Sequence, residues 1–136
     1  DGAFDLIFHP IANGYIPDVL PLWRECFRVL RLGGRLLAGF TNPLVYLFDE
    51  EIEGHGHHEL VVRHKVPYAD PTSLAPEALS RRVSAGQTIE FGHTLDDQIG
   101  GQLAAGFVLT AFYEDTHDQH LDRYIPTQAA TLAIKP

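Results

Sequence analysis

The residues best suited to chemistry lie near the start of the chain, where His9 and Pro10 follow an apolar run that begins at Phe4. Such a run is typical of a buried strand, and ligand crevices of open α/β sheets lie at the carboxyl ends of such strands. The imidazole of His9 titrates near neutral pH, so His9 could take a proton from a bound molecule. A histidine that only hydrogen-bonds its own loop fits the sequence equally well.

Four other polar residues are candidate substrate-binding residues. Asn13 and Tyr15 lie in the loop after the first apolar run, although Asn13 also belongs to an Asn-Gly turn sequence and Tyr15 could simply pack. Asn42 follows the next apolar run, where a substrate contact and a structural cap are both compatible with the sequence. His93 precedes the helix expected after Thr94.

A histidine-rich stretch contains His55, His57 and His58, with Glu59 beside them. Imidazoles and a carboxylate are ligands that suit zinc or nickel. This stretch is rich in glycine and acidic residues, and no helical or strand pattern fixes the geometry of the side chains. We therefore interpret it as a solvated loop and expect no metal site.

A strand, a helix and a second strand must position the candidate residues. Phe4 to His9 is interpreted as a central strand covered on both faces, and Pro10 ends it. Asp18 is placed to cap a helix. The apolar residues that follow it recur at helical spacing: Val19, Leu20, Leu22, Trp23, Cys26, Phe27, Val29 and Leu30. Gly33-Gly34 then supplies a positive-φ turn into a second buried strand, Arg35 to Phe40.

The pattern loosens over an insertion at about residues 42–93, which we expect to be a lid or a binding loop. Its predicted elements are a short apolar piece at Leu44 to Phe48, a strand at Val61 to Val66, a helix at Pro76 to Val83 and a weak strand at Gln87 to Phe91.

Regular order returns at Thr94, a plausible N-cap for a helix from Leu95 to Ala105. Gly100 and Gly101 in its middle each cost about 1 kcal/mol relative to alanine, which indicates close packing there. Gly106 ends this helix. Two strands are predicted after it, Phe107 to Tyr113 and Thr127 to Ile134.

The chain of 136 residues, of which 45% are hydrophobic, is long enough for one domain with a core and too short for two. The order of the predicted strands and helices makes this an α/β domain. Ten basic residues against 18 acidic ones give a formal charge of −8, which argues against nucleic-acid and anionic-membrane partners. The single cysteine, Cys26, has no disulfide partner, and no run of 18 apolar residues occurs. We expect a cytoplasmic protein.

The segment Trp23-Arg24-Glu25-Cys26-Phe27-Arg28-Val29-Leu30, followed by Gly33-Gly34 and a strand, resembles the second half of a class I S-adenosylmethionine-dependent methyltransferase. The segment Phe91 to Leu103, with its Asp-Asp-Gln-Ile-Gly-Gly sequence, is similar to one in a small bacterial branch of methyltransferases of type 11. Tyr113-Glu114-Asp115 and Ile125-Pro126-Thr127 extend the resemblance over nearly the whole chain.

The resemblance implies a Rossmann-like sheet of seven strands, with the last strand antiparallel and inserted between the fifth and sixth. This chain would supply strands four to seven, and the glycine-rich loop that holds the cofactor would lie outside it. Leu6 and Leu36 should then lie on parallel neighbouring strands. We expect the full-length protein to bind S-adenosylmethionine, and this part alone to bind it poorly.

In this interpretation Phe8, His9 and Pro10 contact the cofactor, His9 acts as the base, and the methyl acceptor is a small molecule. The loop sequence from His9 to Asn13 departs from the Asn/Asp-Pro-Pro-Tyr pattern of amino-methylating relatives, so the acceptor atom stays open. A non-catalytic α/β association module with a vestigial crevice is the alternative. Loss of a neighbouring strand would leave the edge of the first strand exposed, and we expect self-association through that edge.

Overall fold

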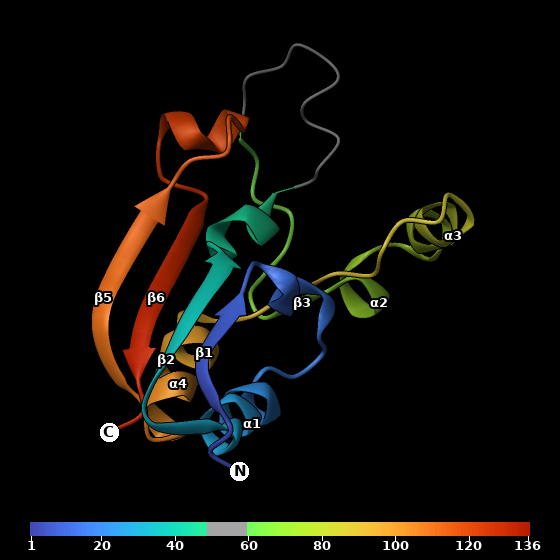
Figure 1. The fold of residues 1–136 in the computed structure, drawn as a ribbon. Helices are drawn as coiled ribbons and strands as arrows, with labels where there is room; N and C mark the ends of the chain where they lie inside the picture. Colours follow the sequence, from blue (N-terminus) through green and yellow to red (C-terminus); the bar gives the residue numbers. More distant parts are fainter. Residues whose placement is uncertain (49–59) are drawn as a thin grey trace.

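The computed structural model describes residues 1–48 and 60–136. Its main feature is a four-stranded sheet in the order β1-β2-β6-β5 (Figure 1). The strands of this sheet are β1 (Phe4–His9), β2 (Leu30–Thr41), β5 (Val108–Asp115) and β6 (Gln128–Ile134). β1 and β2 are parallel, and β6 is antiparallel to both of its neighbours. The expected antiparallel last strand is therefore confirmed.

The β-α-β unit at the start of the chain is also confirmed. Leu6 pairs with Arg35 and Ile7 pairs with Leu36 across the parallel strands. Helix α1 (Leu20–Val29) connects them, and the Asp18 carboxylate accepts a 2.9 Å hydrogen bond from the amide of Leu20. Gly33 has the expected positive φ, 73°, a conformation that favours glycine. It lies within β2, which already begins at Leu30 directly after α1, so the prediction of a turn before a strand from Arg35 was wrong.

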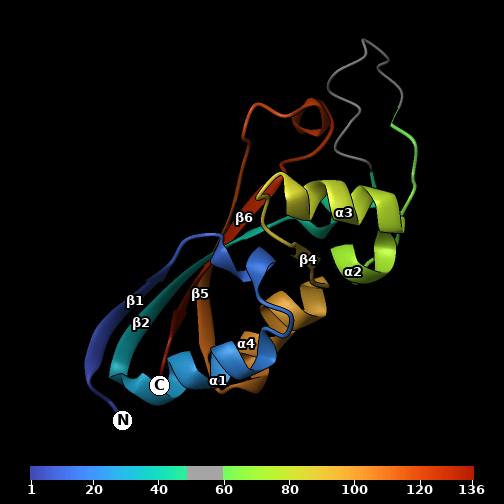
Figure 2. The same ribbon diagram turned by 90° about the vertical axis from the view of Figure 1, so that its right-hand side faces the viewer.

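Helices α1 and α4 (Gly101–Ala104) cover one face of the sheet (Figure 2). Alternate residues of β2 point into this layer, because successive side chains of a strand point to opposite faces. The side chains buried between helices and sheet form the core: Val19, Trp23, Cys26, Leu30, Leu36, Ala38, Phe107 and Ala133. The core therefore has two layers, one sheet face and one pair of helices.

The predicted helix from Leu95 to Ala105 is present over residues 95–104, but part of it is π-helical. Thr94 caps it through its hydroxyl, which accepts a 3.0 Å hydrogen bond from the amide of Asp97. A π-helical segment, η4 (Asp96–Gly100), then leads into α4. A Cβ at Gly101 would lie 2.7 Å from Cδ1 of Trp23, so the expected close packing is confirmed, against α1.

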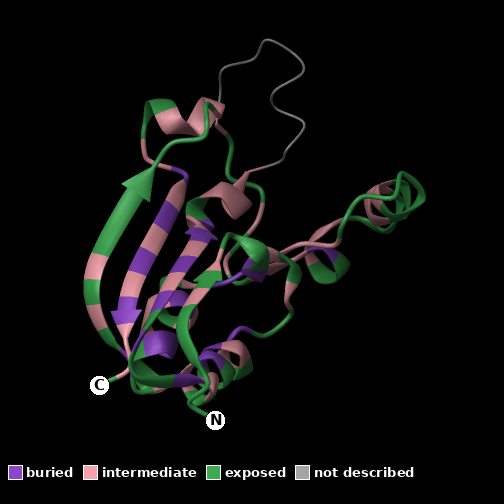
Figure 3. Cartoon of the chain, in the orientation of Figure 1, coloured by how far each residue is buried: buried purple, intermediate pink, exposed green. Residues whose placement is uncertain are grey.

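The opposite face of the sheet carries no helix among the described residues. β1 lies at the edge of the sheet, where Leu6 is 58% exposed and Phe8 is 66% exposed (Figure 3). Val108 and Tyr113 of β5 are also about half exposed. The expectation that β1 is covered on both faces was therefore wrong for the described residues, because neither a strand beyond β1 nor a second layer is present there.

The region between β2 and η4 forms a small lobe beside the sheet (Figure 1). Its described elements are η2 (Pro43–Leu47), β3 (Tyr68–Ala69), α2 (Asp70–Ser73), α3 (Pro76–Ser84) and β4 (Phe91–Gly92). The helix predicted after Ala75 is confirmed. The predicted strand at Val61 to Val66 was wrong: Val62 is 62% exposed, and the amides of Arg63 and His64 both bond to the carbonyl of Leu47 rather than to a strand.

The weak strand predicted at Gln87 to Phe91 is reduced to Phe91 and Gly92, which pair with Ala69 and Tyr68. A short 3-10 helix, η5 (His120–Arg123), lies between β5 and β6. None of the helices in the described ranges is long and apolar enough to cross a membrane.

Candidate functional site

The loop after β1 has a strained backbone at Ile11. This β-branched residue has a φ of 46°, in the left-handed region that such residues rarely occupy. Its amide donates a 3.2 Å hydrogen bond to the carbonyl of Gly39, and a Cβ at Gly39 would lie 3.2 Å from Cγ1 of Ile11. Strain of this kind costs about 1–3 kcal/mol and clusters at functional sites. The loop follows the carboxyl end of a parallel strand, so position and strain both mark it as the candidate site.

His9 is half-buried at the end of β1 and faces the helical layer. Its ring lies edge-on to Trp23, with 5.8 Å between ring centroids. Its Nε2 atom is buried and has no hydrogen-bond partner among the described residues. Burial lowers the pKa of His9, so the ring is neutral at pH 7 and can accept a proton.

Phe8 and Pro10 flank His9 but do not share its surroundings. Successive residues of a strand point to opposite faces, so Phe8 points to the bare face of the sheet while His9 points toward Trp23. Pro10 is exposed where the strand ends. Both offer exposed apolar surface to a ligand.

Asn13 is almost completely buried within the 3-10 helix η1 (Ala12–Tyr15). Its side-chain amide donates a 2.6 Å hydrogen bond to Oε1 of Gln98, and its own Oδ1 is buried without a partner among the described residues. Gln98 accepts a bond through its backbone carbonyl from Gln102 at 2.8 Å, and Gln102 accepts one from the hydroxyl of Thr131 at 2.8 Å. A buried polar chain therefore ties the loop through η4 to β6.

The sequence analysis did not identify Gln98, Gln102 and Thr131. A signal was present, because Gln98 and Gln102 are four residues apart and so lie on the same face of a helix, the face that is buried here. The sequence did not indicate the hydrogen-bond partner of each side-chain amide, since Asn13 and Gln98 are 85 residues apart in sequence.

His93 forms hydrogen bonds to the other side of the same loop. Its Nε2 atom lies 3.1 Å from the carbonyl oxygen of Asn13 and 2.9 Å from that of Ile16. Both partners are acceptors, so Nε2 carries the proton and donates. The structure thus brings His93 and Asn13 together and makes His93 a support of the loop. Contact with a substrate remains a prediction for both residues.

Asn42 and Tyr15 lie in contrasting environments. Asn42 accepts a 3.1 Å hydrogen bond from the amide of Leu44 and donates one of 3.1 Å to the carbonyl of Pro126. Asn42 therefore caps η2, which is the structural role that the sequence allowed beside substrate contact. Tyr15 is 54% exposed on the loop. Asn42 is therefore committed to structure, whereas Tyr15 is available to a ligand.

The histidine-rich stretch with His55, His57, His58 and Glu59 lies outside the described residues. Within residues 1–48 and 60–136, no group of three or more histidine, cysteine, aspartate or glutamate side chains is placed to hold a metal ion.

Comparison with known proteins supports this interpretation of the fold. Over 135 residues the chain is 47% identical to a protein of Bacillus subtilis described as the uncharacterized methyltransferase YbaJ. The match takes in 99% of this chain and 52% of the relative, so the chain spans about half the length of the curated relative that it matches. No family model matches the chain.

Two solved structures share the architecture. An S-adenosylmethionine-dependent methyltransferase from Mesorhizobium loti superposes with a TM-score of 0.68 at 16% identity, over 98% of this chain and 62% of that protein. One from Methanosarcina mazei gives a TM-score of 0.59 at 17% identity, over 99% and 60% respectively. At such identities the likeness shows the fold. The curated homologue is a methyltransferase, and the resemblance predicted from the sequence is confirmed.

Proposed function

We propose that this chain is the acceptor-side part of a longer class I S-adenosylmethionine-dependent methyltransferase, which transfers a methyl group to a small molecule. The observation that carries the proposal is the 47% identity to a methyltransferase over almost the whole chain. The strained loop at the carboxyl end of β1 supports it, because ligands of open α/β sheets bind at that edge.

Three consecutive residues at the end of β1 and the start of this loop, Phe8, His9 and Pro10, are the proposed cofactor contacts. Phe8 and Pro10 offer exposed apolar surface, and His9 offers a buried ring nitrogen without a partner among the described residues. This combination of apolar surface and one unsatisfied polar atom fits a cofactor with both apolar and polar parts. S-adenosylmethionine, when bound, supplies the methyl group from a sulfonium centre.

His9 is the proposed base. Its neutral ring can take the proton that the acceptor loses as the acceptor atom bonds to the methyl group, while the electron pair of the broken bond stays with the departing sulfur. Asn13 and His93 keep the loop in place for this step through Gln98 and Ile16. Tyr15, exposed on the same loop, is a proposed acceptor contact.

The bare face of the sheet supports the proposal that more chain packs here. Four large side chains of this face are each at least half exposed: Leu6, Phe8, Val108 and Tyr113. Exposing so much apolar surface to water on one sheet is unfavourable in free energy. In the longer protein we expect further residues to cover this face and to complete the cofactor site.

Calorimetry with S-adenosylhomocysteine tests the proposal. The full-length protein should bind it with micromolar or tighter affinity, and the 136-residue chain alone should bind it poorly. Full-length protein in which His9 is replaced by glutamine should bind S-adenosylhomocysteine more weakly and should also lose most of its turnover, because His9 is both a proposed cofactor contact and the proposed base. Absence of binding by the full-length protein would contradict the proposal.

The bare apolar face also favours a second candidate, a non-catalytic association module with a vestigial crevice. This alternative predicts that the full-length protein does not bind the cofactor and still self-associates through the sheet.

A further inference from the structure

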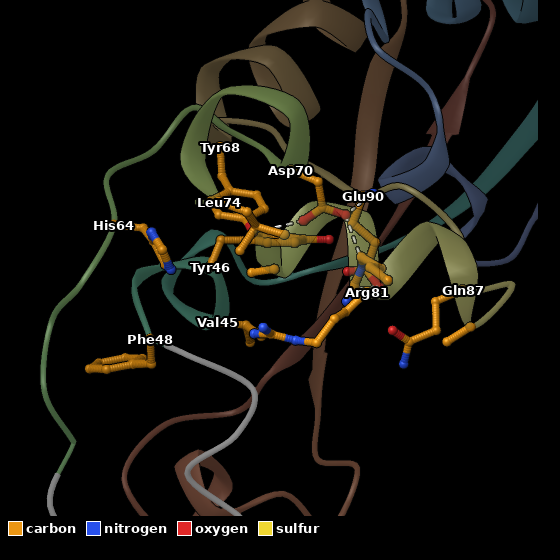
Figure 4. A pocket seen from close by; sticks show the side chains of 13 residues that line it. Val45, Tyr46, Phe48, His64, Tyr68, Asp70, Leu74, Arg81, Gln87 and Glu90 are labelled. Atoms are coloured by element: carbon orange, nitrogen blue, oxygen red, sulfur yellow. Dashed lines mark hydrogen bonds and ion pairs between the residues drawn. The ribbon is translucent and has the colours of Figure 1, made fainter. Parts of the chain in front are cut away.

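A pocket of about 420 Å³ lies in the lobe between β2 and η4. It is bounded by η2, by the segment that leads into α2, and by α3 (Figure 4). Its volume is within the range of sites that hold small organic molecules. None of the candidate residues that fall within the described ranges lines it.

One side of the pocket is aromatic. The rings of Tyr46 and Tyr68 stack with 5.3 Å between centroids and an interplanar angle of 25°, and His64 meets Tyr68 edge-on at 5.2 Å. Figure 4 shows these rings together on one side of the pocket, with Arg81, Gln87 and Glu90 on the other. Rings arranged in this way favour a flat ligand that extends the stack.

Tyr46 joins the pocket to the loop after β1. A Cβ at Gly92 would lie 2.5 Å from Cδ2 of Tyr46, so the ring rests directly on the backbone of β4. Its hydroxyl lies 3.1 Å from the place that a Cβ of Gly14 would occupy. Gly14 follows Asn13 in the candidate site, so the pocket and the proposed catalytic loop share a wall.

The two acidic groups among the described residues that line the pocket are already paired. The Asp70 carboxylate is buried, accepts a 2.7 Å hydrogen bond from the hydroxyl of Tyr68, and lies 2.9 Å from Nε of Arg82. Arg82 also bonds to Glu90 at 3.0 Å. This arrangement holds Tyr68 in position for stacking and leaves neither carboxylate as an obvious partner for a cationic ligand.

Arg81 is the remaining arginine among the described residues that line the pocket. No ion pair involves it among the described residues, and its side chain is on the exposed side of α3. A guanidinium binds a carboxylate through two parallel N–H donors, which makes Arg81 a suitable anchor for an acidic group at the mouth.

We infer that this pocket holds the methyl acceptor, and that the acceptor is a small aromatic molecule with one anionic group. The inference rests on the proposed function for the acceptor's role, although binding of an aromatic acid is testable without the cofactor. The stacked tyrosines hold the aromatic ring, Arg81 holds the acidic group, and Tyr46 places the ring beside Gly14 in the loop that follows His9.

The test is calorimetric titration of the full-length protein, without cofactor, with four probes. They are 4-hydroxybenzoate, its uncharged amide, cyclohexanecarboxylate and the aromatic cation tyramine. We expect 4-hydroxybenzoate to bind most tightly of the four. Arg81→Gln should weaken the binding of 4-hydroxybenzoate about tenfold or more and leave the binding of the amide unchanged, because only the charged contact is removed. Arg24→Gln, on the exposed surface of α1, is the matched control and should change nothing.

Three results would overturn the inference: equal binding of cyclohexanecarboxylate, preference for tyramine, or unaltered binding of 4-hydroxybenzoate by Arg81→Gln. Absence of binding by any probe at millimolar concentration would do so as well. Failure of the proposed function is a separate result, because it appears as loss of S-adenosylhomocysteine binding, whereas the pocket is measured with aromatic acids alone.

Discussion

Nε2 of His93 lies 2.9 Å from the carbonyl oxygen of Ile16, across 77 residues of sequence. This hydrogen bond, with the second one to Asn13, attaches the loop after β1 to the segment that begins η4. The strained backbone at Ile11 lies between this attachment and the end of β1. A strained loop persists only when its surroundings hold it, and His93 is one of the residues that do so.

Replacing His93 with phenylalanine should lower the free energy of unfolding by about 1–3 kcal/mol, because the carbonyl of Ile16 loses its donor while the ring volume is kept. Denaturant unfolding of the full-length protein measures the loss. Amide hydrogen exchange at residues 13–16 should also become faster. His117→Phe, at an exposed position, is the control, and equal effects of both changes would rule out the supporting role.

Adjacent glycines in η4 and α4 should respond differently to alanine. Gly101→Ala should destabilise the protein by about 1–3 kcal/mol, because the new Cβ meets Trp23 and Leu20 of the packed helix α1. Gly100→Ala meets only the flexible carboxylate of Asp96 and should be neutral or stabilising by up to about 1 kcal/mol. Thermal unfolding of the pair measures the contrast. Equal Tm values would show that α1 and α4 are not closely packed.

Protonation of Asp122 should make part of the free energy of unfolding depend on pH in the acid range. Burial would raise its pKa, but hydrogen bonds from the Thr127 hydroxyl and from backbone amides, including those of His117 and Gln119, hold the pKa at about 2. The stabilisation is thus complete above the pKa of the unfolded chain, near 4, and is lost as the pH falls through about 2. Asp122→Asn should lower Tm at pH 7 and much less at pH 2.

The control for this pH effect is Asp118→Asn. No side-chain hydrogen bond of Asp118 is present among the described residues, and its positive φ of 56° is one that asparagine tolerates. Its Tm should follow that of the unmodified protein at both pH values. An Asp122→Asn deficit that persists undiminished at pH 2 would exclude ionisation as its cause.

Cys26 should be unreactive in the folded protein. Burial, with a smaller contribution from Glu25, raises the pKa of its thiol to about 11, so very little thiolate exists near pH 8. An aromatic disulfide reagent should label Cys26 slowly in buffer and completely in denaturant. Rapid labelling of the native protein would show that the core between α1 and the sheet opens readily.

The 136-residue chain by itself should self-associate through β1, an edge strand with exposed apolar side chains. Leu6→Lys should shift the population toward monomer in sedimentation velocity, since lysine blocks pairing at an open edge. Leu32→Lys is the control, because Leu32 is 70% exposed but lies outside the edge strand. A chain that is already monomeric at high concentration would contradict the expectation.

The regular elements were predictable wherever local sequence determines them. The Thr94 hydroxyl accepts a hydrogen bond at the start of its helix, as expected, whereas Asp18 precedes the N-cap residue Val19 and accepts a bond from the amide of Leu20. Gly33 has the expected positive φ, but it lies within β2 rather than in a turn. The order of the strands followed from the family resemblance rather than from periodicity. The environment of Phe8 could not be read from its own apolar segment, because exposure depends on which neighbours the sheet has.

The candidate site was predictable in place but only partly in detail. The position of His9 at a strand end followed from its sequence, whereas its contact with Trp23 required the packing of α1 on the sheet. The hydrogen bond between Asn13 and Gln98 could not be predicted, since nothing local pairs residues so far apart. The pocket beside Tyr46 was missed for the same reason, because its walls come from segments that lack a strong pattern of their own.

The position of β6 affects how the sheet can assemble. β6 lies between β2 and β5 and is hydrogen-bonded to both, although it follows them in sequence. During synthesis on the ribosome, β2 and β5 therefore emerge before the strand that joins them, and β5 has no place in the sheet until residues 128–134 have left the exit tunnel. A stop codon ahead of this segment would release a product in which β2 and β5 are not joined, and we expect chaperones and proteases to act on it.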